Sequence, residues 1–174
     1  MVVVWGRLVN QFSLMARFGG WANERLYGAV SGLSEDAYRK DGGAFFGSIH
    51  NTLNHLLVVD RLWTGRIEGR DRGITALDQI LHDDFSSLRE ARTAEDRRLI
   101  DVVDGLSDAA LERPVTYRRI IGDGEQKTRC DHILLTLFNH QTHHRGQVHV
   151  LLTQAGIVPP PLDVVFFLEE IGFS

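Results

Sequence analysis

The sequence of 174 residues lacks the features that mark secreted, membrane-spanning or nucleic-acid-binding chains. It has one cysteine, Cys130, which excludes an internal disulfide. No apolar run approaches the roughly 20 residues of a membrane-spanning helix, and the apolar start of the chain is too short for a signal peptide. The formal net charge is -4 and no basic cluster stands out. We therefore expect a cytoplasmic protein with no nucleic-acid or membrane partner.

The composition is that of a globular protein, with 43% hydrophobic and 24% charged residues. The length suits one domain with a sizeable core. No internal repeat, low-complexity tract or linker divides the chain. We therefore expect a single domain over residues 1–174.

Apolar residues recur at helical spacing in four long stretches, which predicts an all-α four-helix bundle. The expected helices cover residues 8–31, 48–66, 83–104 and 131–155. β-branched residues on both sides of Gly122-Asp123-Gly124 predict a small β-hairpin before the fourth helix. Residues 162–171 follow a run of three prolines and predict a short C-terminal helical segment.

The first expected helix has a second apolar strip beyond the face that one bundle core needs, made of Leu14, Phe18 and Trp21. Monomeric proteins rarely expose large contiguous apolar patches. The strip could be covered by the C-terminal segment or by another subunit. We expect a homodimer.

A helical histidine pair is the strongest functional signal. His140 and His144 are four residues apart on one face of the fourth expected helix, so their rings stack one turn above the other. Two imidazoles at this spacing can bind one metal ion. The alternative is a pair of core histidines hydrogen-bonded to backbone or water. On the second expected helix, His55 and His50 lie at opposite edges of the apolar face, and spacing does not choose between them as a third ligand.

Three charged residues interrupt apolar helix faces. Asp60 needs a buried partner; it could orient a histidine through that ring's other nitrogen, or form a salt bridge to an arginine elsewhere in the bundle. Arg92 and Glu95, three residues apart, could pair with each other. We predict that at least one of them borders the cavity in front of the metal; the alternative is that this flank of the helix faces solvent.

Other polar residues surround the histidine pair in the sequence. His143 faces away from the ligand face, which favours a surface position or a contact to a ligand over ligation. Gln147, one turn beyond, could hydrogen-bond near the site or face solvent. Cys130 precedes the fourth expected helix, and we interpret it as a buried, inert thiol rather than an activated one.

Three stretches taken together resemble the DinB family. Residues 139–147, Asn-His-Gln-Thr-His-His-Arg-Gly-Gln, closely resemble its fourth-helix motif. Residues 53–63, Leu-Asn-His-Leu-Leu-Val-Val-Asp-Arg-Leu-Trp, resemble its second-helix motif, and residues 21–26, Trp-Ala-Asn-Glu-Arg-Leu, its first-helix signature. Residues 163–170 are similar to its tail. The chain departs from the family at Phe18-Gly19-Gly20, where members commonly have Tyr-Asn.

This resemblance implies a four-helix bundle with DinB-like connectivity, often a homodimer, and a divalent metal held by three histidines. The matching positions are His55, His140 and His144, so the resemblance selects His55 over His50. We expect one metal ion per chain, with zinc or nickel favoured and iron, manganese or copper as alternatives. Three imidazoles leave a coordination position open, as in catalytic sites.

The resemblance further implies a metal-dependent enzyme of the thiol S-transferase type, which would act on a low-molecular-weight thiol and an electrophile. A metal-dependent hydrolase is an alternative. A non-catalytic stress-response protein whose metal only holds helices together is another.

Overall fold

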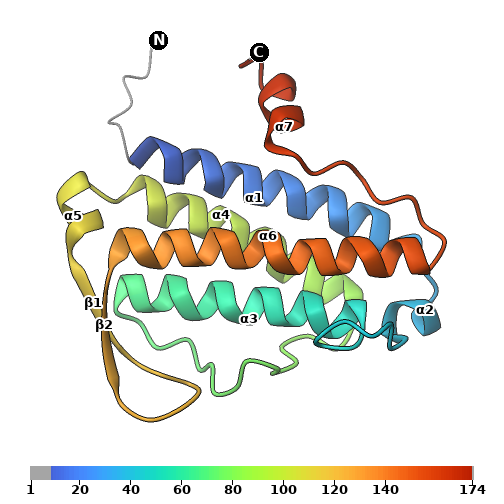
Figure 1. Ribbon diagram of the computed structural model, residues 1–174, viewed down its shortest axis with the longest axis horizontal. Coiled ribbons are helices and arrows are strands. Elements are labelled where there is room, and N and C mark those ends of the chain that lie inside the picture. The colour runs from blue at the N-terminus through green and yellow to red at the C-terminus, as the bar shows by residue number, and fades with distance from the viewer. Residues whose placement is uncertain (1–8, 174) are drawn as a thin grey trace.

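The computed structural model describes residues 9–173 and shows a bundle of four long helices, α1 (Val9–Val30), α3 (Ile49–Glu68), α4 (Phe85–Asp104) and α6 (Cys130–Gln154) (Figure 1). Strands β1 (Pro114–Arg118) and β2 (Glu125–Arg129) form an antiparallel hairpin before α6, and α7 (Val164–Glu170) ends the fold. The predicted bundle, hairpin and terminal helical segment are confirmed. Leu8, where we expected the first helix to begin, lies outside the described residues. So do residues 1–5, the apolar start of the chain that is too short for a signal peptide.

Local chemistry sets the helix ends. Ser48 caps α3 by accepting a hydrogen bond from the backbone N–H of Asn51, and Asp84 caps α4 in the same way. Gly69 ends α3 at φ 68°, a left-handed conformation that glycine adopts without strain. Two short helices, α2 (Glu35–Arg39) and α5 (Asp108–Glu112), add to the expected fold. Five residues are too few to show an apolar period, so the sequence pattern did not reveal them.

The long helices are not arranged in simple chain order. Helix α1 packs against α4 and α6, and α3 also packs against α4 and α6, so α1 and α3 lie diagonally across the bundle. The α2 segment carries the chain across that diagonal. Helices α3 and α6 lie side by side on the near face of the bundle in Figure 1. This neighbourhood brings the second-helix and fourth-helix motifs together.

Two apolar clusters fill the bundle, one toward each end. Leu26, Leu53, Leu57 and Leu152 belong to the first. The second is formed by Leu99, Val103, Ile133, Leu134 and Leu137. Burial of apolar side chains in both clusters supplies the main stabilisation of the fold. Among residues 9–173, no helix combines the length and apolarity needed to cross a bilayer.

Helix α7 covers the second apolar strip of α1. The Phe167 ring centroid lies 6.0 Å from that of Phe18 and 5.7 Å from that of Trp21. The Trp21 indole N–H donates to a carboxylate oxygen of Glu170 at 3.0 Å. The intramolecular cover is thus the one present, and the strip does not by itself require a second subunit. The homodimer stays a prediction.

Candidate functional site

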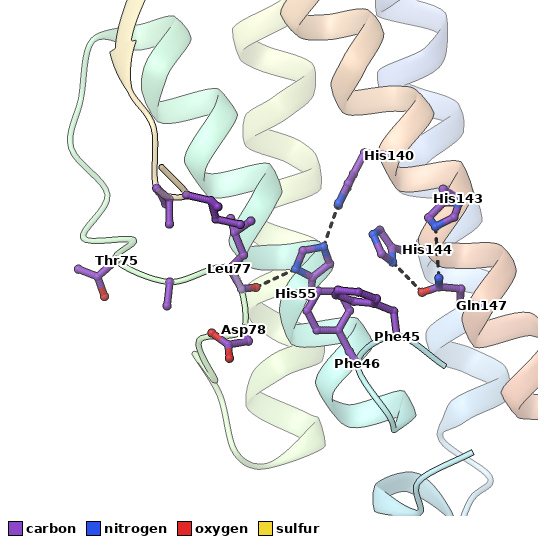
Figure 2. A pocket seen from close by; sticks show the side chains of 13 residues that line it. Phe45, Phe46, His55, Thr75, Leu77, Asp78, His140, His143, His144 and Gln147 are labelled. Atoms are coloured by element: carbon purple, nitrogen blue, oxygen red, sulfur yellow. Dashed lines mark hydrogen bonds between the residues drawn. The ribbon is translucent and has the colours of Figure 1, made fainter. Parts of the chain in front are cut away.

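Three histidines from two helices converge between α3 and α6. His55 projects from α3, and His140 and His144 project from successive turns of α6 (Figure 2). One nitrogen from each ring lies within 4.8 Å of the others, and the Nε2 atoms of His55 and His140 are 2.9 Å apart. His50 is buried elsewhere, against the ring of Tyr38. The structure therefore brings together the three positions that the family resemblance selected.

Neighbouring groups fix the orientation of two of the rings. His55 Nδ1 donates to the carbonyl of Leu77 at 2.7 Å, which leaves Nε2 as the lone-pair nitrogen. The Phe46 ring stacks on His55 with centroids 3.9 Å apart. His144 Nδ1 donates to Gln147 Oε1 at 2.8 Å, and Gln147 Nε2 in turn donates to His143 Nε2 at 3.2 Å. Such contacts to the second ring nitrogen are typical of metal-binding histidines.

Burial keeps these imidazoles neutral. It lowers the pKa of His55 to about 4, with the neighbouring His144 adding to the effect. Burial and three neighbouring histidines, His144, His55 and His143, lower the pKa of His140 to about 3. Burial also lowers the pKa of His144. At neutral pH all three rings therefore carry the free lone pair that a metal requires.

The donor set fits a divalent metal ion. Among the described residues, Nδ1 of His140 is buried without a hydrogen-bond partner. The Nε2 atoms of His55 and His140 face each other at 2.9 Å, so both can point at one ion. Three neutral imidazoles suit zinc, nickel, iron or copper.

A cavity of about 800 Å³ opens in front of the histidines. Its walls come from residues 45–46, from residues 75–78 and from the hairpin turn at Ile120 and Ile121. At the rim, Phe45 is 83% exposed and Ile121 71% exposed, so large apolar side chains border the entrance. His143 and Gln147 also line it. The site is thus a groove over α3 and α6 roofed by loops, outside the bundle core.

The prediction that Arg92 or Glu95 borders the histidine cavity is wrong, and of the two roles considered for Asp60 the structure shows the salt bridge. All three are buried, but none lines the histidine cavity. Asp60 Oδ2 instead accepts from Arg92 Nη1 at 2.7 Å and from Gln141 Nε2 at 2.8 Å. It therefore forms the alternative salt bridge and orients no histidine.

Glu95 does not pair with Arg92. It accepts from the hydroxyl of Thr64 at 2.8 Å and pairs with Arg98 at 3.3 Å. Helix α4 packs against α1 and α3, whereas the histidine cavity opens over α3 and α6. The polar side chains of α4 therefore reach an interior network away from the cavity.

Cys130 lies at the start of α6, packed in the apolar cluster that contains Ile133 and Leu134. It is 2% exposed, and burial raises the pKa of its thiol. A buried, protonated thiol is a poor nucleophile. These features agree with the interpretation of Cys130 as inert.

The fold and the site define a class: a helical-bundle protein with a three-histidine group that could bind a metal, placed under a loop-roofed cavity. The chain belongs to the DinB family, whose family model matches residues 9–171. It is 26% identical over 158 residues to Protein DinB of Bacillus subtilis (strain 168), which covers 85% of this chain and 88% of that protein.

Two solved structures share the fold. A DinB-like protein from Bacillus cereus ATCC 10987 aligns with a TM-score of 0.62 at 18% identity, covering 81% of this chain and 90% of that one. A DinB-like protein from Bacillus subtilis aligns with a TM-score of 0.60 at 18% identity, covering 90% of this chain and 96% of that one. At such identity the likeness shows the fold alone.

Proposed function

We propose that the protein is a metal-dependent enzyme of the thiol S-transferase type, which joins a low-molecular-weight thiol to an electrophile. The observation that carries the proposal is the group of three neutral histidines facing a cavity of about 800 Å³. A structural ion is normally closed off by protein ligands, whereas a catalytic ion keeps a position for water or substrate.

His55, His140 and His144 would hold one divalent ion, with zinc or nickel favoured over iron, manganese or copper. When bound, the ion supplies a Lewis acid that lowers the pKa of a thiol or of water. The Leu77 carbonyl and the Gln147 side chain keep the ligand rings of His55 and His144 in the required tautomer. Their contribution is positional, because neither group needs to touch a substrate.

The cavity walls determine which substrates fit. Phe46 stacks on His55, and Phe45 and Ile121 add apolar surface at the rim, so the cavity would reduce the hydration of a bound thiol. A less hydrated thiolate is a stronger nucleophile toward an apolar electrophile. Among the described residues that line the cavity, Asp78 is the one carboxylate. We assign Asp78 the role of accepting the proton that the thiol loses, or of passing that proton to solvent.

Thiol consumption tests the proposal. Protein loaded with zinc or nickel should speed the reaction of a small thiol with chlorodinitrobenzene above the uncatalysed rate, and chelation should remove that rate until metal is restored. The metal-stripped protein is the matched control.

Two results would contradict the proposal. Hydrolysis of a nitrophenyl ester that needs metal but no thiol would favour the hydrolase alternative. No turnover of either kind with any of the metals would favour the non-catalytic alternative.

A further inference from the structure

A second cavity, of about 470 Å³, adjoins the histidine cavity. Thr75 and Ile120 line both, so they form the wall between the two spaces. The second cavity has one carboxylate, that of Asp71, and five arginines: Arg66, Arg70, Arg72, Arg118 and Arg119. This is a concentration of positive charge in a chain whose formal net charge is -4.

Most of this charge is not neutralised by the protein. Within residues 9–173, Arg72 is the only one of the five with a carboxylate in ion-pair range, Glu95 at 3.7 Å, and Glu95 is shared with Arg61 and Arg98. The Asp71 carboxylate accepts the backbone N–H of Gly73 at 2.8 Å and so caps its own loop. Unpaired arginines in a concave surface focus a positive potential.

The walls of the arginine cavity are held in place. The Arg66 guanidinium lies 4.4 Å from the Trp63 ring centroid and 4.2 Å from that of Tyr117. Its Nη2 donates to the carbonyl of Arg118 at 2.8 Å, which ties the end of β1 to α3. Such stacking and hydrogen bonding fix a guanidinium that would otherwise be mobile.

Gly65 lets the loop after α3 lie close to the helix. A Cβ at this position would lie 2.7 Å from the carbonyl oxygen of Arg70, closer than real Cβ atoms approach. The absence of a side chain therefore lets the loop after α3 pack against the helix. That packing places Arg70 and Arg72 at the cavity.

We propose that the arginine cavity is an anion subsite of the same active site, which binds a carboxylate or phosphate group of the substrate while the reacting atom lies at the histidines. The inference rests on the proposed function and names its substrate class: a thiol or an electrophile with an anionic end. Arginine pairs with carboxylate and phosphate oxygens through two parallel hydrogen bonds. A negatively charged protein needs such a local positive surface to retain an anionic substrate.

Direct titration tests the subsite without any activity. Inorganic phosphate, which carries a phosphate group, and succinate, which carries carboxylates, are titrated by calorimetry into metal-free protein. The test variant is Arg70→Gln/Arg119→Gln, because Arg66 also holds β1 in place. The matched control is Lys127→Gln, which removes an exposed cation from the same hairpin outside the cavity.

We expect the double variant to bind at least one of the anions about tenfold more weakly, as the loss of charge-assisted hydrogen bonds implies, and the control to match wild type. Equal binding by all three proteins would overturn the inference.

Paired thiols test whether the subsite serves the histidine site. Zinc-loaded protein is titrated with unbranched thiols from mercaptoacetate to mercaptoundecanoate and with the equal-length thiols that end in a hydroxyl. Once the thiol is long enough to span the two cavities, we expect the carboxylate-ended thiol to bind more tightly than the hydroxyl-ended thiol of equal length. The double variant should lose this difference in affinity. A preference absent at every length, or unchanged in the variant, would overturn the link. Failure of the proposed function is separately visible as absence of metal-dependent thiol turnover, while the phosphate and succinate titrations still give their own result.

Discussion

The His144→Ala variant should lose its bound metal and all metal-dependent turnover, and it should keep its helical circular dichroism. The His144 ring is one of three metal donors, because it lies beside His55 and His140 and is oriented by the contact of its Nδ1 with Gln147. Two imidazoles bind a divalent ion far more weakly than three. The apolar clusters at both ends of the bundle contain none of the three histidines. We therefore expect the fold to persist without the ion. Metal content, turnover and circular dichroism measured on one preparation check this.

His132→Ala is the matched control for that variant. His132 is on the same helix, its side chain is 64% exposed, and it does not line the histidine cavity. We expect its metal content and turnover to equal those of wild type. Unfolding of the His144→Ala protein on metal loss would make the ion structural. Undiminished turnover in that protein without metal would place the chemistry elsewhere in the cavity, with Asp78 and His143 the first residues to test.

Asp60→Ala should lower the free energy of unfolding by about 3–5 kcal/mol, the cost of removing one partner from a buried ion pair. The carboxylate is fully buried and accepts from Arg92 and Gln141. Its loss leaves the buried Arg92 guanidinium with Asp96 as its remaining acidic partner. Urea unfolding of wild type and variant measures the change.

Glu35→Ala removes the same charge from an exposed ion pair with Arg39 and is the control for the Asp60 variant. We expect a much smaller loss, because exposed pairs contribute little. The folded Asp60→Ala protein should retain wild-type metal content, since Asp60 contacts no histidine of the site. An unfolding free energy equal to that of wild type would contradict the proposed importance of the buried pair. A loss of metal would restore the idea that Asp60 supports the ligands.

Apolar periodicity predicted the four long helices because each buries a continuous face over twenty or more residues. The same periodicity could not choose between His50 and His55, since both lie at edges of one face. The difference arises from the loop before α3 and the segment after it. Phe46 stacks on His55, and the Leu77 carbonyl accepts a hydrogen bond from His55 Nδ1. Neither segment has a periodic pattern from which these contacts could be predicted.

The charged residues show the same limit in the bundle interior. Arg92 and Glu95 interrupt an apolar face and are both buried, so this flank of the helix does not face solvent. The position of this flank depended on which helices α4 contacts, and the diagonal arrangement of α1 and α3 is not encoded in helix lengths or spacing. The arginine cavity could not be predicted from the sequence for a related reason. Its members come from α3, the following loop and the hairpin, so they form a cluster only after folding.

Elemental analysis tests most directly whether His55, His140 and His144 hold one divalent ion. Wild-type protein and the variants His140→Ala and His132→Ala are purified without a metal-binding affinity tag and analysed for zinc, nickel, iron, manganese and copper. We predict close to one equivalent of divalent metal per chain in wild type and in His132→Ala, and almost none in His140→Ala. Equal metal content in all three proteins, or no uptake by wild type even after incubation with zinc or nickel, would contradict the claim.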